Sequence, residues 1–233
     1  LQASINAVSG RMEEAAALHQ KLAAEFNVYI LGSSAPVQAE FDLPVNRAEF
    51  YSPCGARDHQ DKQIMTLFER DPWAIGSGGP LKLFDTALGK IGVLICYDSE
   101  FPLLGRALNE ADILLVPSCT EALAGYWRVR IGAMARALEQ QCVTVMASVV
   151  GQAAWCDAVD MNTGAGSVFG PPDTGFPATG VIAEGELNRP GWTHAQIDLG
   201  AVAEVRRAGG VRNRTHWTEQ GTSDGEVTYI SLL

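Results

Sequence analysis

The chain has 233 residues, of which 47% are hydrophobic and 19% charged, and its formal net charge at pH 7 is −10. A chain of this size and apolar content can bury a sizeable core, so we expect residues 1–233 to form a single domain. The acidic balance argues against nucleic acid or an anionic membrane as partner, because binding phosphate requires clustered Lys and Arg.

No apolar run reaches the roughly 18 residues that a membrane-spanning helix needs, so we expect no membrane partner. The start of the sequence shows no basic segment followed by an apolar one, which argues against a signal peptide. The five cysteines are odd in number and lack the paired spacing of a zinc site. They are Cys54, Cys96, Cys119, Cys142 and Cys156. We therefore expect reduced thiols in a cytoplasmic protein and no bound metal.

The first fifty residues predict one helix and two short strands. Residues 11–26 carry large apolar side chains near helical spacing, with Ser9 as a candidate cap. Residues 28–32 predict a short buried strand. Residues 35–50 contain two prolines and no clear period, which predicts a loop or a broken edge hairpin, and residues 50–52 are a candidate strand.

The rest of the chain predicts strands that alternate with helices, which indicates an α/β fold class. Two strands, 81–85 and 91–95, form a hairpin in which Gly89 takes a left-handed conformation. The later elements in chain order are a helix at 103–109, a strand at 113–116, a helix at 125–141, and strands at 143–147, 167–169, 181–184 and 194–198.

The stretch from Lys90 to Pro102 is the most informative part of the sequence. A short apolar run rich in β-branched residues ends abruptly at Cys96, and a helical pattern starts at Pro102. A thiol at such a strand-to-helix turn is held clear of the sheet, and backbone N–H groups of the turn can face an oxyanion. A nearby helix N-terminus would lower the pKa of the thiol. The alternative is a buried core cysteine, because free cysteine behaves as a small hydrophobe.

Four segments in order resemble the nitrilase superfamily, the carbon–nitrogen hydrolases. Cys96-Tyr97-Asp98-x-x-Phe101-Pro102 resembles the family's nucleophile segment, and residues 57–69 resemble its catalytic-lysine segment. Residues 111–118 resemble the strand that follows, and residues 133–140 resemble the helix with the family's Arg-Ala-x-Glu-Asn signature. The match extends from about Asn27 to Trp217.

The resemblance implies a four-layer α-β-β-α sandwich that commonly pairs through its helices, so we expect a homodimer or a higher homo-oligomer. The tail with Arg212, Arg214 and Trp217 resembles the family's C-terminal extension, which commonly reaches across a dimer interface. The family also places a catalytic glutamate on a strand before the helix at 11–26, and this sequence lacks its first strands. Glu13 and Glu14 cannot replace that glutamate, because both lie on the predicted helix. Either the natural N-terminal portion is missing or the protein is a degraded member, and the first is favoured because family domains open with a strand.

The chemistry implied is hydrolysis of a non-peptide C–N bond, above all that of a small carboxamide. Cys96 would attack the amide carbon, while Lys62 and the Tyr97 backbone N–H hold the oxyanion. Glu69 would be an acidic partner of Lys62, and a glutamate outside these residues would move the proton. No metal or organic cofactor is implied. Tyr97-Asp98 stands where nitrile hydrolases usually have Trp-Glu, which favours an amidase.

Three residues are candidates for substrate binding. Many family members carry an arginine four residues after the nucleophile, which can receive a substrate carboxylate, and here that position is Glu100. The reversed charge predicts neutral or amine-bearing carboxamides over monoamides of dicarboxylic acids and over N-carbamoyl amino acids. The alternative is that Glu100 caps the following helix. Tyr126 and Trp127 are candidates for pocket lining through apolar or cation–π contacts, or else they are packing residues.

Three other functions stay open. The missing glutamate is compatible with a catalytically inactive binding or assembly subunit, which the reading frame upstream of Leu1 would distinguish by lacking a strand that ends in Pro-Glu. A nitrile or N-carbamoyl hydrolase of the same family would be separated from an amidase by its substrates. Acyl transfer to an amine would require an acceptor before product forms.

Overall fold

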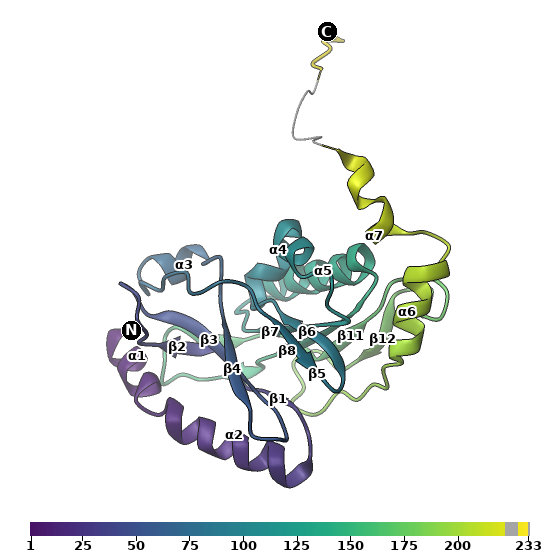
Figure 1. Cartoon of the computed structure of the whole chain (residues 1–233). Coiled ribbons are helices and arrows are strands. Elements are labelled where there is room, and N and C mark those ends of the chain that lie inside the picture. Colours follow the sequence, from purple (N-terminus) through teal and green to yellow (C-terminus); the bar gives the residue numbers. More distant parts are fainter. Residues whose placement is uncertain (222–227, 233) are drawn as a thin grey trace.

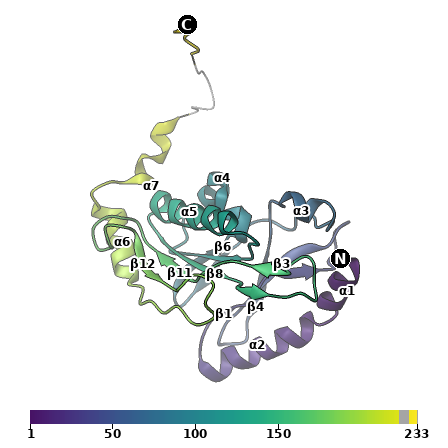
Figure 2. The ribbon, with the colours of Figure 1, turned by 180° about the vertical axis from the view of Figure 1, so that it is seen from behind.

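The computed structural model describes residues 1–221 and 228–232 and shows an α/β fold in four layers (Figure 1). Helix α2 (Met12–Phe26) covers a four-stranded sheet, and a six-stranded sheet lies behind it. Helices α4 (Pro102–Ala107) and α5 (Leu123–Gln140) cover the outer face of the larger sheet, as Figure 2 shows from behind. The predicted fold class and the order of the layers are confirmed. In the described part of the chain, no helix is both long enough and apolar enough to cross a membrane.

The smaller sheet carries the lysine segment. Its strands are β1 (Ile30–Leu31), β2 (Ala35–Val37), β3 (Val45–Tyr51) and β4 (Arg57–Asp61). Strands β1 and β2 both pair with one side of β3, and β4 pairs with the other side. Within residues 1–221 and 228–232, the outer edge of β1 and β2 pairs with no further strand. The sequence did not predict β4, because its polar side chains find charged partners, such as Arg47 on Asp61.

The larger sheet carries the cysteine segment. Its order is β12-β11-β8-β7-β6-β5, and the central strands β6, β7 and β8 are parallel. Its strands are β5 (Leu83–Thr86), β6 (Gly89–Val93), β7 (Ile113–Ser118), β8 (Val143–Ser148), β11 (Ser167–Phe169) and β12 (Val181–Glu184). The predicted hairpin is confirmed, and Gly89 has a φ of +91°. The carboxyl ends of β6, β7 and β8 meet at one edge, which is where sites form in such sheets.

Short elements connect these layers. They are α1 (Gln2–Ser9), α3 (Leu67–Arg70), the 3-10 turn η1 (Cys96–Glu100), β9 (Gly151–Gln152), β10 (Met161–Asn162), α6 (Leu199–Ala208), α7 (Asn213–His216) and the 3-10 turn η2 (Trp217–Gln220). Figure 1 shows α7 leading away from the body of the fold toward the C-terminus.

Two local predictions are wrong. Ser9 does not cap the second helix: it ends α1, and its hydroxyl oxygen accepts a hydrogen bond from the Gln38 N–H at 3.0 Å. Residues 194–198 form no strand; instead, the Asp198 side chain accepts from the Gly200 N–H and caps α6. An alternating pattern of five residues is too short to separate a strand from an irregular segment.

Helix α2 is present as predicted, but its buried face is rotated away from the largest apolar residues. Ala16 and Ala23 are fully buried and pack against Tyr51 of β3, whereas Leu18 and Phe26 are exposed. Small residues bring the helix close to the sheet, and the Tyr51 ring fills the space between them.

Candidate functional site

Cys96 opens the η1 turn, three residues after β6 ends. Its φ is +52°, in the left-handed region that side chains other than glycine rarely adopt. The thiol Sγ donates a long hydrogen bond of 3.7 Å to the carbonyl oxygen of Cys119, which follows the neighbouring parallel strand β7. A conformation of this kind costs energy and persists only where the surrounding structure enforces it, and such residues are common at functional sites. The side chain is half-buried.

Lys62 and Glu69 form a buried ion pair next to this turn. The Lys62 Nζ lies 2.6 Å from both carboxylate oxygens of Glu69, and the two residues are only 2% and 6% exposed. Glu69 also accepts hydrogen bonds from the Thr66 N–H and hydroxyl, in a capping box that starts α3. Burial raises the pKa of Glu69, but the Lys62 ammonium and the hydrogen bonds outweigh it, so the net pKa lies below its usual value. The Glu69 carboxylate is therefore charged at neutral pH.

Asp98 connects the lysine loop to the cysteine turn. Its carboxylate accepts from the backbone N–H groups of Gln63 and Ile64 at 2.9–3.2 Å, and the residue is 1% exposed. Burial raises the pKa of Asp98 to about 6, although these hydrogen bonds oppose the shift. Because Gln63 follows Lys62 directly, the position of the lysine depends on Asp98. Asp98 belongs to the nucleophile motif in the sequence, but no role was predicted for its side chain.

The electrostatics of the thiol differ from the prediction. Burial raises the pKa of Cys96, and the Lys62 charge and the hydrogen bond from the Tyr97 backbone only partly oppose this effect. The predicted lowering of the thiol pKa is wrong, because α4 begins only at Pro102, six residues after Cys96. The thiol is therefore protonated at neutral pH, and a base has to remove its proton when it attacks.

Helix α5 supports the cysteine turn from outside. Gly132 lies so close to this turn that a methyl group in place of its hydrogen would be 2.8 Å from the Ser99 carbonyl oxygen. One turn further along α5, Arg136 donates to the same oxygen at 3.1 Å. Gly105 of α4 leaves room for the Arg136 side chain. The glycine inside the helical pattern was the available signal for this close packing.

The predicted substrate-binding residues lie in different surroundings. Glu100 ends η1, and its Oε1 is 3.7 Å from the Nε of Arg128 on α5, so it pairs with a residue that the sequence analysis did not single out. The alternative role of Glu100 as a first-turn residue is wrong, because α4 starts after it, at Pro102. Tyr126 is buried in the core cluster against which Cys96 packs, whereas Trp127 is half-exposed.

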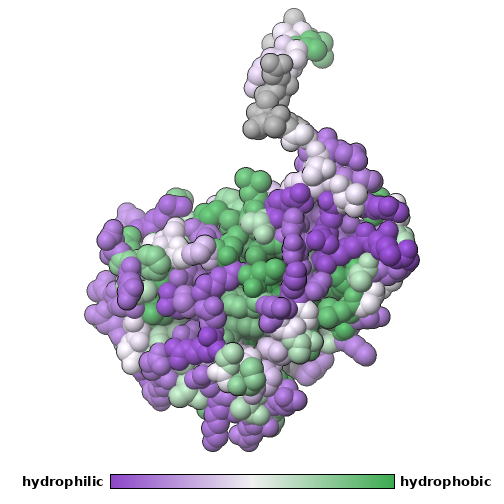
Figure 3. Space-filling model, viewed as in Figure 1, coloured by the Kyte–Doolittle hydropathy of each residue, from purple (hydrophilic) through white to green (hydrophobic). Residues whose placement is uncertain are grey.

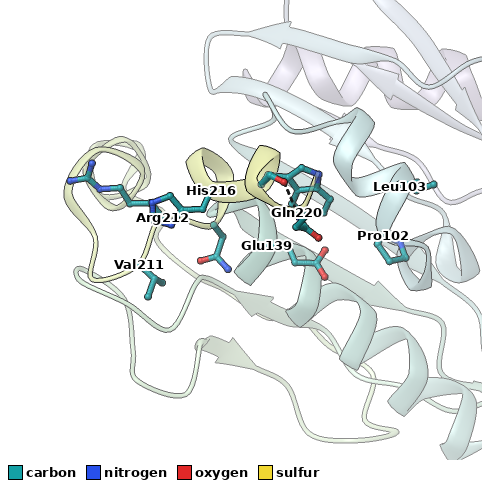
Figure 4. A pocket seen from close by; sticks show the side chains of 9 residues that line it. Pro102, Leu103, Glu139, Val211, Arg212, His216 and Gln220 are labelled. Atoms are coloured by element: carbon teal, nitrogen blue, oxygen red, sulfur yellow. Dashed lines mark hydrogen bonds between the residues drawn. The ribbon is translucent and has the colours of Figure 1, made fainter. Parts of the chain in front are cut away.

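Two hollows lie near these elements. A slot of about 530 Å³ between the sheets is lined mainly by apolar side chains, such as Leu31 and Phe50 from one sheet and Leu115 and Val145 from the other, and it reaches Cys119. A groove of about 660 Å³ lies between α4, the end of α5 and the chain from Val211 through η2. Figure 4 shows Pro102 and Leu103 on one side of it, Val211, Arg212 and His216 on the other, and Glu139 between them. Cys96, Lys62 and Glu69 lie outside the lining of this groove. The slot is the hollow that adjoins the candidate site.

Comparisons with known proteins show which family the chain resembles. A family profile described as carbon-nitrogen hydrolase matches residues 3–207. The chain is 34% identical over 211 residues to the probable hydrolase YhcX of Bacillus subtilis, covering 90% of this chain and 41% of YhcX. It is 29% identical over 204 residues to a deaminated glutathione amidase of Synechocystis, covering 81% of this chain and 71% of that protein.

The structural comparison gives the same fold. The crystal structure of Saccharomyces cerevisiae Nit3, described as a member of branch 10 of the nitrilase superfamily, superposes with a TM-score of 0.68. It is 23% identical in sequence, and the match covers 81% of this chain and 66% of that one. The chain thus spans less than half the length of YhcX and about two thirds of the length of Nit3.

Proposed function

Because the chain belongs to the carbon–nitrogen hydrolase family within the nitrilase superfamily, we propose that it hydrolyses a small carboxamide to a carboxylate and ammonia. The observation that carries this proposal is a strained cysteine turn which Asp98 ties to a loop bearing a buried lysine–glutamate pair. A thiol beside a fixed ammonium suits acyl transfer, because the ammonium stabilises the negative charge that develops on the carbonyl oxygen.

In the proposed reaction, the Cys96 sulfur attacks the amide carbon as its proton moves to a base. The Lys62 ammonium and the Tyr97 backbone N–H would stabilise the oxyanion, and the hydrogen bond to Glu69 holds the lysine in place. The base returns the proton to the nitrogen as the C–N bond breaks, ammonia leaves, and a thioester on Cys96 remains. Water, deprotonated by the same base, then cleaves the thioester and regenerates the thiol. This scheme needs no metal or organic cofactor.

The base is proposed to be a glutamate outside residues 1–233. Glu69 and Asp98 are poor candidates, because the lysine pair and the Thr66 cap occupy the first, and two backbone N–H groups occupy the second. The apolar slot that reaches Cys119 and the unpaired outer edge of β1 and β2 support entry of further strands at this place. Expressing the natural reading frame with the codons upstream of Leu1 should give an amidase, whereas residues 1–233 alone should be slower by about 10²–10⁴-fold. Equal rates would assign the base to a residue of this sequence.

The direct test is ammonia release from a panel of amides, nitriles and N-carbamoyl compounds by the natural full-length protein. Cys96→Ala should abolish release, and mass spectrometry of the wild type should find the trapped acyl group on the peptide that contains Cys96. Cys54→Ala is the matched control, because Cys54 is an exposed thiol in the loop between β3 and β4, where its Sγ contacts the Ser52 hydroxyl. An acyl group on another cysteine would refute the assignment of the nucleophile.

A catalytically inactive binding or assembly subunit is the second candidate. The observation in its favour is that Glu69 and Asp98, the two buried carboxylates beside the cysteine turn, are already engaged. Such a subunit would release no ammonia in any length of the reading frame and would form no adduct on Cys96. A thioester trapped on Cys96 excludes this function.

We also propose a homodimer in the cytoplasm. Large apolar side chains are exposed on the outer helices, among them Leu103 of α4 and Ile131 of α5, and Figure 3 shows apolar surface over α4. The resemblance implies pairing through these helices, and all five cysteines are free, as a reducing compartment requires. Light scattering after size exclusion measures the mass in solution. Ile131→Glu should shift a dimer toward the monomer, because it buries an unpaired charge in the interface.

A further inference from the structure

The ion pair between Glu100 and Arg128 is looser than the others in the candidate site. The Nε of Arg128 is 3.7 Å from the Oε1 of Glu100, compared with 2.6 Å between Lys62 and Glu69. The Arg128 side chain is 63% exposed and the Glu100 side chain 21% exposed. A partly exposed pair at this distance contributes little to stability, so a ligand can separate it at low cost.

The pair lies where the cysteine turn ends, at what we call the rim of the cysteine site. Arg128 is on the face of α5 that meets the cysteine turn, one helical turn before Gly132, which contacts Ser99. Its Nη2 also lies 3.8 Å from the place a methyl group on Gly125 would occupy, and that methyl would be 3.1 Å from Thr120. The guanidinium is therefore placed between the end of the cysteine turn and the segment after β7. Cys119, whose carbonyl contacts the Cys96 thiol, directly precedes Thr120.

The two charges side by side select a particular kind of group. A carboxylate that bound Arg128 alone would meet the like charge of Glu100, and an ammonium that bound Glu100 alone would meet the like charge of Arg128. A group with both charges satisfies both side chains, since its carboxylate replaces Glu100 on the guanidinium while its ammonium replaces Arg128 on Glu100. Burial raises the pKa of Glu100 despite the nearby Arg128 and Lys62, so the Glu100 carboxylate gains from a second cation.

We propose that Glu100 and Arg128 form a subsite for a zwitterionic amino-acid head group, so that the substrate is the side-chain amide of a free amino acid. The inference rests on the proposed amidase function and specifies its substrate class. It changes the substrate prediction made from Glu100 alone. With Arg128 beside it, the site accepts a carboxylate, provided that an ammonium accompanies it.

Four matched amides test the subsite in the natural full-length protein. L-glutamine carries both charges, the monoamide of glutaric acid carries only the carboxylate, γ-aminobutyramide carries only the ammonium, and butyramide carries neither. We expect kcat/KM to be highest for glutamine, by about tenfold or more over butyramide. Dissociation constants measured by calorimetry on the Cys96→Ala variant should follow the same order without turnover.

Neutral variants of Glu100 and Arg128 should change the order of kcat/KM among the four amides in opposite ways. Glu100→Gln should lower kcat/KM for glutamine and γ-aminobutyramide, because the carboxylate that attracts their ammonium is gone. It should raise kcat/KM for the glutaric monoamide, because the like charge is gone, and each change should be about threefold to tenfold. Arg128→Gln should do the reverse for the two singly charged amides, and Arg128→Lys should restore part of the glutamine preference. Arg207→Gln is the control: Arg207 forms an exposed ion pair with Glu204 on α6, and its loss should change none of the four.

The results separate this inference from the proposed function. If the protein hydrolyses butyramide through Cys96 but the variants change all four amides by one common factor, the subsite is refuted and the amidase stands. If no amide is hydrolysed and no adduct forms on Cys96, the amidase is refuted. In that case, the calorimetric order of the four amides still decides whether the zwitterion subsite exists.

Discussion

The buried pair of Lys62 and Glu69 allows the sharpest test of how this site is held together. Glu69→Gln removes one charge of the pair and leaves the Lys62 ammonium at 2% exposure without its counter-ion. Breaking a buried ion pair from one side costs about 3–5 kcal/mol, because an uncompensated charge stays in the interior. For a chain of this length, each kcal/mol corresponds to roughly 2–4 °C in Tm, so we expect a loss of roughly 6–20 °C.

Urea unfolding followed by circular dichroism measures this loss, and a second variant tests its cause. Lys62→Met together with Glu69→Leu removes both charges and keeps apolar volume, so it should recover much of the stability that Glu69→Gln loses. It should not recover activity, because the ammonium that faces the oxyanion is gone. Glu204→Gln breaks an exposed pair instead and should cost no more than about 1 kcal/mol.

The pH dependence has a definite sign. The pKa of Glu69 is lowered in the fold, so its contribution to stability is present above the ordinary carboxyl pKa of 4.5 and is lost as pH falls through the folded value. The difference in stability between wild type and Glu69→Gln should therefore shrink in acid. A cost below about 1 kcal/mol for Glu69→Gln, or a double variant less stable than the single one, would refute the assignment of a tight buried pair.

Three further outcomes are expected. Asp98→Ala leaves two buried N–H groups without an acceptor and should lower the free energy of unfolding in urea by about 2–6 kcal/mol. It should also lower kcat by roughly 10²-fold, because Lys62 is displaced. Asp98→Asn keeps one acceptor and should lose less of both stability and kcat. Because the pKa of Asp98 rises to about 6 from 3.8, its contribution to stability is present below pH 3.8 and is lost as pH rises through 6, so the stability of the wild type relative to Asp98→Asn should fall as pH rises through that window. Gly132→Ala pushes a methyl group against the Ser99 carbonyl and should cost about 1–3 kcal/mol, whereas Ala124→Gly, at the exposed start of α5, should cost no more than about 1 kcal/mol.

The sequence predicted the parts of the site that a single segment carries. A strand followed by a cysteine and a helical pattern is visible in consecutive letters, and so is a lysine seven residues before a glutamate. The contact of Asp98 with Gln63 and Ile64 joins residues 34 and 35 positions apart and arises only when the two sheets pack together. No local pattern encodes such a contact, so its role could not be predicted.

The misses in the fold have a common physical cause. Strand β4 is polar because its charged side chains pair with neighbours, so it lacks the apolar alternation by which strands are recognised. Helix α2 buries alanines rather than its larger residues, because a tyrosine from the sheet occupies the space between them. In both cases, the partner across the interface decides which side chains are buried, and periodicity within one segment does not contain the partner.

Helix α5 links the position of the nucleophile to the charge at the rim. Residues 125, 128, 132 and 136 recur at helical spacing on one face of α5. The first lies against Thr120, the second pairs with Glu100, and the last two lie against the Ser99 carbonyl. Because the helix is rigid, moving it displaces the cysteine turn as a whole, whereas changing one side chain on this face alters only what that side chain touches. Gly132→Ala should therefore lower kcat/KM for glutamine and butyramide by the same factor, while Arg128→Gln should change their ratio. If both variants changed the ratio alike, positioning and recognition would not be separable on this helix, and the rim charge would act through the geometry of the turn.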